Sequence, residues 1–354
     1  MNKAHLKYLF FVTKPYSFSI LEPIQDAIIN SNCGYVKWFA ASSAKKYSCP
    51  DDQLKSNKEV LEYDPDAVLV PGNVVPHFWP GLKVQIFHGL DEEVKGFYII
   101  TGFFDLYCTT GSVMTKKFSA MAKQKKHFLV KETGWPKLDP IFKNEWDFGN
   151  QKNQLIKQYS LNPELPLILY APTFPPKYTS APDLLDAIKK LKSVKYNWII
   201  KFHSLMDESI QKKYKQLENE NLRVVDELNI LPIMAGSDIM ITDTSSVAYE
   251  FLPFDRPLVT YQAIARKNKG INIQNPTELA PAIERSFNNP REFSPYRKSC
   301  MQDIHPYADG NSANRVLTGI REILANGLQN DLKQKPQNII RKYQIRKIIA
   351  KSQV

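Results

Sequence analysis

The sequence predicts an α/β protein with two open parallel sheets, each covered by helices on both faces. From residue 7 onward, short apolar runs alternate with helical patterns, and the alternation restarts near residue 165 after a polar segment at 144–162. The chain has 354 residues, whereas one domain typically has about 150. These observations predict a repeated βαβ unit in two domains.

The predicted first domain covers residues 1–150 and the second covers residues 151–328. Strands of the first are expected in the runs YLFFV, GYVKWFA, DAVLV and KVQIF, and strands of the second in LILYA, NWIIK, LRVV, IMIT and PLVTY. Residues 311–325 are expected to form a closing helix of the second domain. The two sheets are expected to face each other, with ligands beyond the carboxyl ends of the strands.

The composition, 43% hydrophobic and 23% charged, is that of a packed globular protein. No run approaches the ~20 apolar residues that span a bilayer, and LKYLFFV at the amino terminus is expected to be a buried strand rather than a signal peptide. The protein is therefore expected in the cytoplasm. Four cysteines (Cys33, Cys49, Cys108 and Cys300) lie too far apart in sequence to form a metal-binding motif.

A net charge of +11 indicates attraction to an anionic partner, which leaves nucleic acid, nucleotide and phospholipid open. Much of this charge lies in a tail at 329–354, where basic residues alternate with isoleucines. A helix there would carry a narrow apolar stripe beside a basic face, which is typical of an interfacial helix on an anionic membrane leaflet. The alternative is a solvated terminal helix docked on its own protein.

Several polar residues follow predicted strands of the second domain. Thr242, Ser245 and Ser246 stand between a buried strand and a helix, where free backbone N–H groups and hydroxyls favour an anion, although simple helix capping is the alternative. Lys201 and His203 stand two residues apart at another strand end. Side chains two apart on a strand share a face, and this pair suits a diphosphate.

In the first domain, His88 follows an apolar run and precedes Gly89. A neutral histidine can accept a proton near pH 7, so the sequence nominates His88 as a general base, with a core or capping histidine as the alternative. Two further polar segments follow strands, one containing Thr173 and one containing Gly134, Pro136, Lys137 and Asp139. Glycine, proline and aspartate are also common turn residues, so these signals are weak singly.

Taken in order, the segments FHG, GWPKLD, LYAPTF, KFHS and ITDTSSVAYEFLPFDRP resemble the motif series of the CDP-glycerol glycerophosphotransferases. The resemblance covers about residues 80–265. It implies a GT-B-like architecture of two Rossmann-like domains, the first on the acceptor side and the second binding the CDP donor. Several positions depart from the family pattern. Phe87 stands where the family usually has tryptophan, and Leu90-Asp91-Glu92-Glu93 follows Gly89 where the family usually has Thr-Pro. Lys137 replaces the usual arginine and Thr244 replaces a tyrosine, and these changes leave the polyol and the acceptor open.

The resemblance implies transfer of glycerol phosphate, or a similar polyol phosphate, from CDP-glycerol or a related CDP-polyol to a hydroxyl group, with release of CMP. It implies that His88 is the general base and that Asp139 is a second catalytic residue. The residues implied to bind substrate are Lys137, Thr173, Lys201, His203, Thr242, Ser245, Ser246 and Glu250, the last standing where the family usually has aspartate. No metal or other cofactor is expected.

The expected acceptor is a lipid-linked or lipopolysaccharide-like glycan that receives one or a few units at the inner face of the cell membrane. One alternative is a glycosyltransferase or epimerase that uses a UDP-sugar, for which the same diphosphate site would serve. Another is a basic nucleic-acid-binding protein, but the sequence contains no recognisable nucleic-acid module, so no nucleic acid is expected as a partner.

Overall fold

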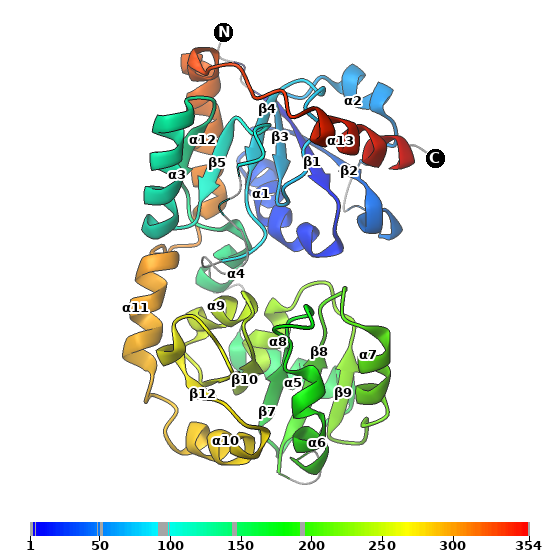
Figure 1. The fold of residues 1–354 in the computed structure, drawn as a ribbon, viewed down its shortest axis with the longest axis vertical. Helices are drawn as coiled ribbons and strands as arrows, with labels where there is room; N and C mark the ends of the chain where they lie inside the picture. Colours follow the sequence, from blue (N-terminus) through cyan, green and yellow to red (C-terminus); the bar gives the residue numbers. More distant parts are fainter. Residues whose placement is uncertain are drawn as a thin grey trace. The chain divides into compact units, whose positions relative to one another are not determined.

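The computed structural model describes residues 3, 5–47, 49, 52–90, 98, 100–143, 147–191 and 195–352. These residues fall into two compact units (Figure 1). Of the described residues, those up to Leu90, from Tyr98 to Lys143 and from Asp303 onward form the first unit, and those from Asp147 to Gln302 form the second.

A parallel sheet forms the centre of the first unit, where the described residues supply six strands in the order β2-β1-β3-β4-β5-β6. The strands are β1 (Leu6–Val12), β2 (Gly34–Ala40), β3 (Ala67–Val70), β4 (Leu82–Gln85), β5 (Leu106–Thr109) and β6 (Leu129–Glu132). The chain passes from β1 to β2 on one side and then returns to place β3 on the other side of β1. Open sheets of this kind bind ligands beyond such a switch point.

Helices cover both faces of the first sheet because side chains along its strands alternate between two apolar layers. They are α1 (Phe18–Asn30), α2 (Asn57–Tyr63), α3 (Ser112–Lys125), α4 (Asp139–Phe142), α12 (Ser312–Asn326) and α13 (Ile339–Ser352), with short 3-10 turns η1 (Pro15–Ser17), η2 (Ser42–Lys46), η4 (Pro136–Leu138) and η8 (Leu328–Asp331). Leu9 and Phe11 of β1 join a buried cluster with Phe118 of α3 and Ile345 of α13. On the other face of the sheet, the ring of Phe10 packs edge-on against the ring of Trp38, with the ring centroids 4.9 Å apart.

The second unit repeats this plan, with six parallel strands among its described residues in the order β12-β11-β10-β7-β8-β9. The strands are β7 (Leu167–Tyr170), β8 (Asn197–Lys201), β9 (Leu222–Val225), β10 (Ile239–Thr242), β11 (Leu258–Tyr261) and β12 (Ile271–Ile273). The helices are α5 (Phe148–Tyr159), α6 (Ala181–Leu191), α7 (Glu208–Lys215), α8 (Leu231–Gly236), α9 (Val247–Phe251), α10 (Leu279–Asn288) and α11 (Ser294–Ile304), with 3-10 turns η5 (Leu252–Phe254), η6 (Lys267–Lys269) and η7 (Pro276–Glu278). The switch point of this sheet lies between β7 and β10.

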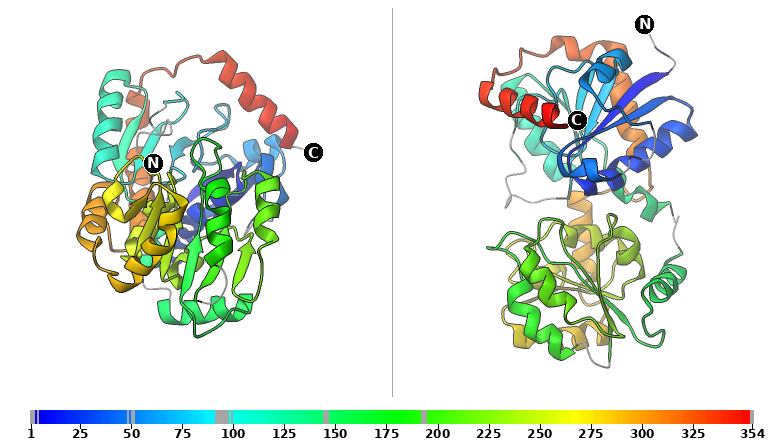
Figure 2. Two further views of the ribbon diagram at one scale, coloured as in Figure 1. Left: turned by 60° about the horizontal axis from the view of Figure 1, so that its bottom comes forward. Right: turned by 90° about the vertical axis from the view of Figure 1, so that its right-hand side faces the viewer.

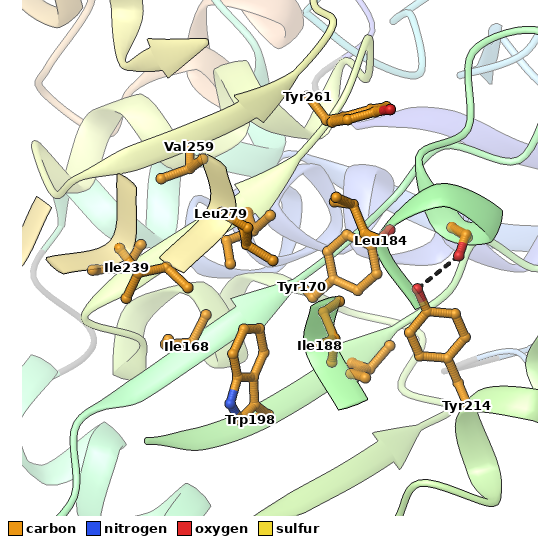
Figure 3. Close-up of a cluster of buried hydrophobic side chains, with 14 of the residues drawn as sticks. Ile168, Tyr170, Leu184, Ile188, Trp198, Tyr214, Ile239, Val259, Tyr261 and Leu279 are labelled. Carbon is orange, nitrogen blue, oxygen red and sulfur yellow. Dashed lines mark hydrogen bonds between the residues drawn. The ribbon is translucent and has the colours of Figure 1, made fainter. Parts of the chain in front are cut away.

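One apolar layer of the second unit packs between its sheet and the helices α6, α7 and α10 (Figure 3). Trp198 and Ile239 come from the sheet, and Leu184 and Leu279 come from the helices. Tyr214 of α7 donates a hydrogen bond from its hydroxyl to the carbonyl of Ala181, at 2.8 Å, so its polar atom is satisfied inside this layer. The predicted fold class, α/β with two parallel sheets, is confirmed.

The domain boundary differs from the predicted one. The closing helix expected at 311–325 forms as α12, but it packs against α1 in the first unit. Arg321 of α12 donates to the carbonyl of Cys33 at 2.6 Å, and Glu322 pairs with Lys131 at 2.6 Å. The second unit therefore ends at Gln302, and the chain returns to the first unit from Asp303 onward.

The basic tail also belongs to the first unit (Figure 2). Lys335 donates to the carbonyl of Phe104 at 2.6 Å and pairs with Asp105 at 2.8 Å. Beyond it, α13 buries Ile345 and Ile349 in the cluster that contains Phe118. One face of the tail is therefore docked on its own protein, as the second of the two sequence interpretations expected.

The side chains of Ile339, Ile340 and Tyr343 at the start of α13 remain 70%, 75% and 67% exposed. Across the described ranges, no helix combines the length and the apolar character that crossing a membrane requires.

Candidate active site

The switch point of the second sheet is organised by a carboxylate that the sequence did not single out. Asp243, directly after β10, is 1% exposed. Its oxygens accept hydrogen bonds from the backbone N–H of Thr173 at 2.9 Å, from the N–H of Ser180 at 2.8 Å and from the Ser180 hydroxyl at 2.8 Å. Asp243 thereby fixes the loop that follows β7. The signal that could have revealed it is an acidic residue at the end of a buried strand beside a proline-rich loop.

Thr242 and Thr173 flank this carboxylate. The hydroxyl of Thr242 is fully buried and donates to the carbonyl of Ala171 at 2.6 Å, so it ties two strand ends together. This geometry does not fit the substrate-binding role expected for Thr242. Thr173 is 5% exposed and its N–H is bonded to Asp243, so its backbone acts in shaping the loop.

Ser245 and Ser246 stand between β10 and α9, as expected from the sequence, and both are half-buried. The N–H of Ser245 donates to the carbonyl of Asp243 at 2.9 Å, which closes a tight turn. Ser246 stands at the N-cap, but its side chain makes no capping hydrogen bond. Among the described residues, no hydrogen bond uses either hydroxyl, so both can serve an anion. Because α9 has only five residues, its dipole contributes little, and an anion here would depend on the hydroxyls.

His203 lies in the loop after β8, which ends at Lys201, so the alternation of a strand does not orient its ring. The backbone N–H of Leu205 donates to Nδ1 of His203 at 3.1 Å. A neutral imidazole with an accepting Nδ1 carries its proton on Nε2, so His203 presents an N–H donor there. Phe174 stacks on the ring, with centroids 4.4 Å apart and planes at 26°. Phe174 is a further site residue that the sequence reasoning did not single out.

Lys201 and Glu250 complete the candidates of the second unit. Lys201 is half-buried, and its ammonium lies 3.5 Å from the carbonyl of Phe202. Glu250 is 5% exposed within α9. The ends of β8 and β10 thus bring the Lys201 ammonium, the His203 imidazole and the Ser245 and Ser246 hydroxyls to the carboxyl edge of the second sheet. Such a set of donors matches the oxygens of a diphosphate.

In the first unit, His88 follows β4 across two buried residues, Ile86 and Phe87. Phe87 has a φ of 65°, in the left-handed region, which turns the chain sharply before His88. The imidazole is half-buried beside the carbonyl of Pro71 and lies 6.1 Å, centroid to centroid, from the ring of Tyr16. Burial lowers the pKa of His88, although the hydrogen bond with Pro71 opposes this. A neutral imidazole at neutral pH is the form that accepts a proton.

Asp139 has a different role from the catalytic one expected. Its side chain is fully buried, and its two oxygens accept hydrogen bonds from the N–H groups of Ser312, at 3.0 Å, and Ala313, at 2.8 Å. These groups begin α12, so Asp139 caps that helix and occupies the position that an anion would take. Neighbouring Lys137 is 6% exposed, and its ammonium lies 5.3 Å from the ring centre of Trp135.

Across the part of the chain that the structure describes, no three or more histidine, cysteine, aspartate or glutamate side chains gather in a way that could hold a metal ion.

Comparison with proteins of known fold supports the architecture. The wall teichoic acid polymerase TagF has a TM-score of 0.69 at 16% identity over 92% of this chain and 90% of that chain. UDP-GlcNAc 2-epimerase from Neisseria meningitidis bound to UDP-GlcNAc has a TM-score of 0.65 at 14% identity over 90% of this chain and 100% of that chain. Both likenesses, at such low identity, concern the fold.

Three curated relatives match the chain over shorter segments. A teichoic acid glycerol-phosphate primase of Bacillus spizizenii is 29% identical over 41% of this chain, and the chain spans 38% of its length. A teichoic acid poly(glycerol phosphate) polymerase of the same strain is 28% identical over 57% of this chain and 48% of its own. A glycerol-phosphate primase of Bacillus subtilis is 25% identical over 66% of this chain and 61% of its own.

A family model matches the chain from His88 to Glu322, in α12. The matched segment, residues 88–322, begins at His88, includes His203, Ser245 and Ser246, and covers more than half of the sequence. With this match, the chain belongs to the CDP-glycerol:poly(glycerophosphate) glycerophosphotransferase family.

Proposed function

We propose that the protein transfers glycerol phosphate, or a similar polyol phosphate, from a CDP-activated donor to a hydroxyl group of a cell-envelope glycan or lipid-linked acceptor. Family membership supports the reaction class, and the relatives named as primase and polymerase support an acceptor related to poly(glycerol phosphate). The observation that carries the proposal is the place of His88 after a parallel strand, where burial lowers the pKa of its imidazole.

In the proposed reaction, the acceptor oxygen attacks the donor phosphorus that bears glycerol. The bond from that phosphorus to the bridging oxygen breaks, and CMP leaves with the bridging oxygen and its electron pair. His88 accepts the proton that the acceptor hydroxyl loses, and the imidazolium later returns it to solvent. The product is a phosphodiester, so one phosphodiester bond replaces one phosphoanhydride bond.

The second unit is proposed to hold the diphosphate. The Nε2–H of His203 donates to a phosphate oxygen, Lys201 supplies a positive charge, and the hydroxyls of Ser245 and Ser246 donate two further hydrogen bonds. Negative charge grows on the CMP phosphate as the bridging bond breaks, and donors that are already fixed in place stabilise that charge without reorganisation.

Donor binding is expected to weaken by about tenfold or more in the variant His203→Ala, because one charge-assisted hydrogen bond and the Phe174 stack are lost. Isothermal titration with CDP-glycerol, CDP-ribitol, UDP-N-acetylglucosamine and CMP measures this. The matched control is Leu205→Ser, which changes a half-exposed side chain but retains the backbone N–H that orients His203. Preference for the UDP-sugar over both CDP-polyols would retain the fold and overturn the reaction.

We further propose that the protein works at the inner face of the cell membrane, in peripheral contact with anionic lipid. The exposed start of α13 supports this, because Ile339, Ile340 and Tyr343 extend into solvent on a helix that also carries Lys342 and Lys347. Apolar side chains beside basic ones bind an anionic leaflet through both burial and charge.

The triple variant Ile339→Ser, Ile340→Ser, Tyr343→Ser is expected to bind vesicles of anionic phosphatidylglycerol at least about tenfold more weakly than the wild type, as measured by co-sedimentation. These side chains are exposed, so the fold is retained, whereas truncation would remove Ile345 and Ile349 from the core. Ile29→Ser, at an exposed isoleucine on α1, is the control. Equal sedimentation of all three proteins would exclude this part of α13 as the lipid contact.

A further inference from the structure

The backbone that carries His88 has an unusual conformation. Phe87 adopts a φ of 65°, a region that a bulky side chain rarely occupies because its Cβ crowds the following carbonyl. The ring of Phe87 is buried, 5.2 Å from the ring of Phe118 and 6.1 Å from that of Tyr107, centroid to centroid. Packing therefore holds the side chain, but these ring contacts do not involve the peptide group between Phe87 and His88.

A second contact fixes that peptide group. Trp135, in the turn that precedes η4, donates a hydrogen bond from its indole N–H to the carbonyl of Phe87, at 3.3 Å. Trp135 is completely buried, and Lys137 lies over its ring at 5.3 Å. Rotation of the Phe87 carbonyl away from this position would leave a buried donor without its partner, which is unfavourable.

We propose that Trp135 is a positioning residue for His88, holding the left-handed backbone at Phe87 so that the imidazole keeps one orientation. This inference rests on the proposed function, in which His88 is the general base. A base acts efficiently only within hydrogen-bond reach of the proton that it removes, and small displacements are costly to the rate. The left-handed backbone at Phe87 directs His88, and the indole hydrogen bond stabilises that backbone.

The variant Trp135→Phe tests this directly, because it retains an aromatic ring and removes the indole N–H. Trp79→Phe is the matched control. Trp79 is also buried in the first unit, at 2% exposure, and its indole N–H donates to Asn57 at 2.7 Å. Each variant loses one indole hydrogen bond, but the bond of Trp79 does not involve the backbone next to His88.

Two readouts are needed. The first is CMP release from CDP-glycerol in the presence of a short poly(glycerol phosphate) chain. Trp135→Phe is expected to lower kcat at least about tenfold with little change in KM for CDP-glycerol, and Trp79→Phe to leave both unchanged. The second is NMR titration of the His88 ring. Its pKa, lowered by burial, is expected to move toward the ordinary value in Trp135→Phe alone, because a less constrained ring is better hydrated.

Equal behaviour of the two variants in both readouts would overturn the proposal. The NMR readout needs no turnover, so it also separates this inference from the proposed function. If the wild type releases no CMP, the reaction assignment fails, and a His88 titration that changes in Trp135→Phe but not in Trp79→Phe still supports the positioning role. An unchanged titration in both variants contradicts it.

Discussion

Replacement of His88 by alanine is expected to lower turnover by about 10²- to 10⁴-fold while donor binding stays near that of the wild type. The imidazole is the proposed acceptor of the proton from the attacking hydroxyl, whereas the proposed diphosphate ligands, Lys201, His203, Ser245 and Ser246, all come from the second unit. Steady-state CMP release measures the rate, and titration with CDP-glycerol measures binding. Loss of both together would instead indicate that His88 is needed for the fold or for the donor.

The pH profile provides a second check on His88. Burial lowers its pKa below the ordinary value of 6.5, so the neutral, proton-accepting form predominates at pH 7. Turnover is therefore expected to be level around neutrality and to fall in acid, with a midpoint below 6.5. His127→Ala is the control, because His127 is also buried in the first unit but makes its ring contact with Phe128. Full turnover in His88→Ala would remove His88 from the role of base.

The sheets were predictable from the sequence because each strand is a short apolar run bounded by turn residues. In β7 (LILY) and β10 (IMIT), all four positions are buried, as in a parallel sheet covered on both faces. The location of the candidate site residues at the strand ends was also predictable, because parallel strands bring their carboxyl ends to one edge of the sheet.

The roles of individual polar residues at those ends were less predictable. Thr242 and Asp139 follow the same pattern as Ser245 and Ser246, but their side chains turn inward and satisfy backbone groups of Ala171 and α12. Whether such a polar side chain points inward depends on a partner that is distant in sequence. The partner of Asp139, for example, lies 173 residues further along the chain. A local sequence pattern contains no information on such a contact.

The return of the chain to the first unit was also hidden from local patterns. The helix α12 has the apolar spacing of any helix that packs on a sheet, with Val316, Ile320 and Ile323 buried. Nothing in that spacing distinguishes one sheet from another. Its place is decided by specific contacts, such as the Asp139 cap and the bond from Arg321 to Cys33, which the sequence does not reveal.

Removal of Asp255 is expected to destabilise the protein by about 3–5 kcal/mol, because it leaves a buried guanidinium without its counter-ion. Arg297 of α11 is 1% exposed, and its Nε donates to the Asp255 carboxylate at 2.8 Å. The Ser294 hydroxyl donates to the other carboxylate oxygen at 2.6 Å. Asp255 belongs to the FDRP segment of the motif that resembles the family, and its expected role is to stabilise the second unit. Urea unfolding of Asp255→Ala measures the loss, and donor binding by the folded variant is expected to remain.

The control is Lys298→Ala, because Lys298 also lies near Asp255, at 3.7 Å, but is 73% exposed. Exposed pairs contribute about 0–1 kcal/mol, so the free energy of unfolding of this variant is expected to be close to that of the wild type.

Burial alone would raise the pKa of Asp255, but the hydrogen bonds from Ser294 and Arg297 and the charge of Arg297 outweigh it and lower the pKa. A carboxyl group with a lowered folded pKa contributes stability above its unfolded pKa and loses it as pH falls through the folded value. The difference between wild type and Asp255→Ala is therefore expected to be greatest near pH 7 and to shrink below about pH 4. Equal unfolding free energies for Asp255→Ala and Lys298→Ala would show that the buried pair does not stabilise the second unit.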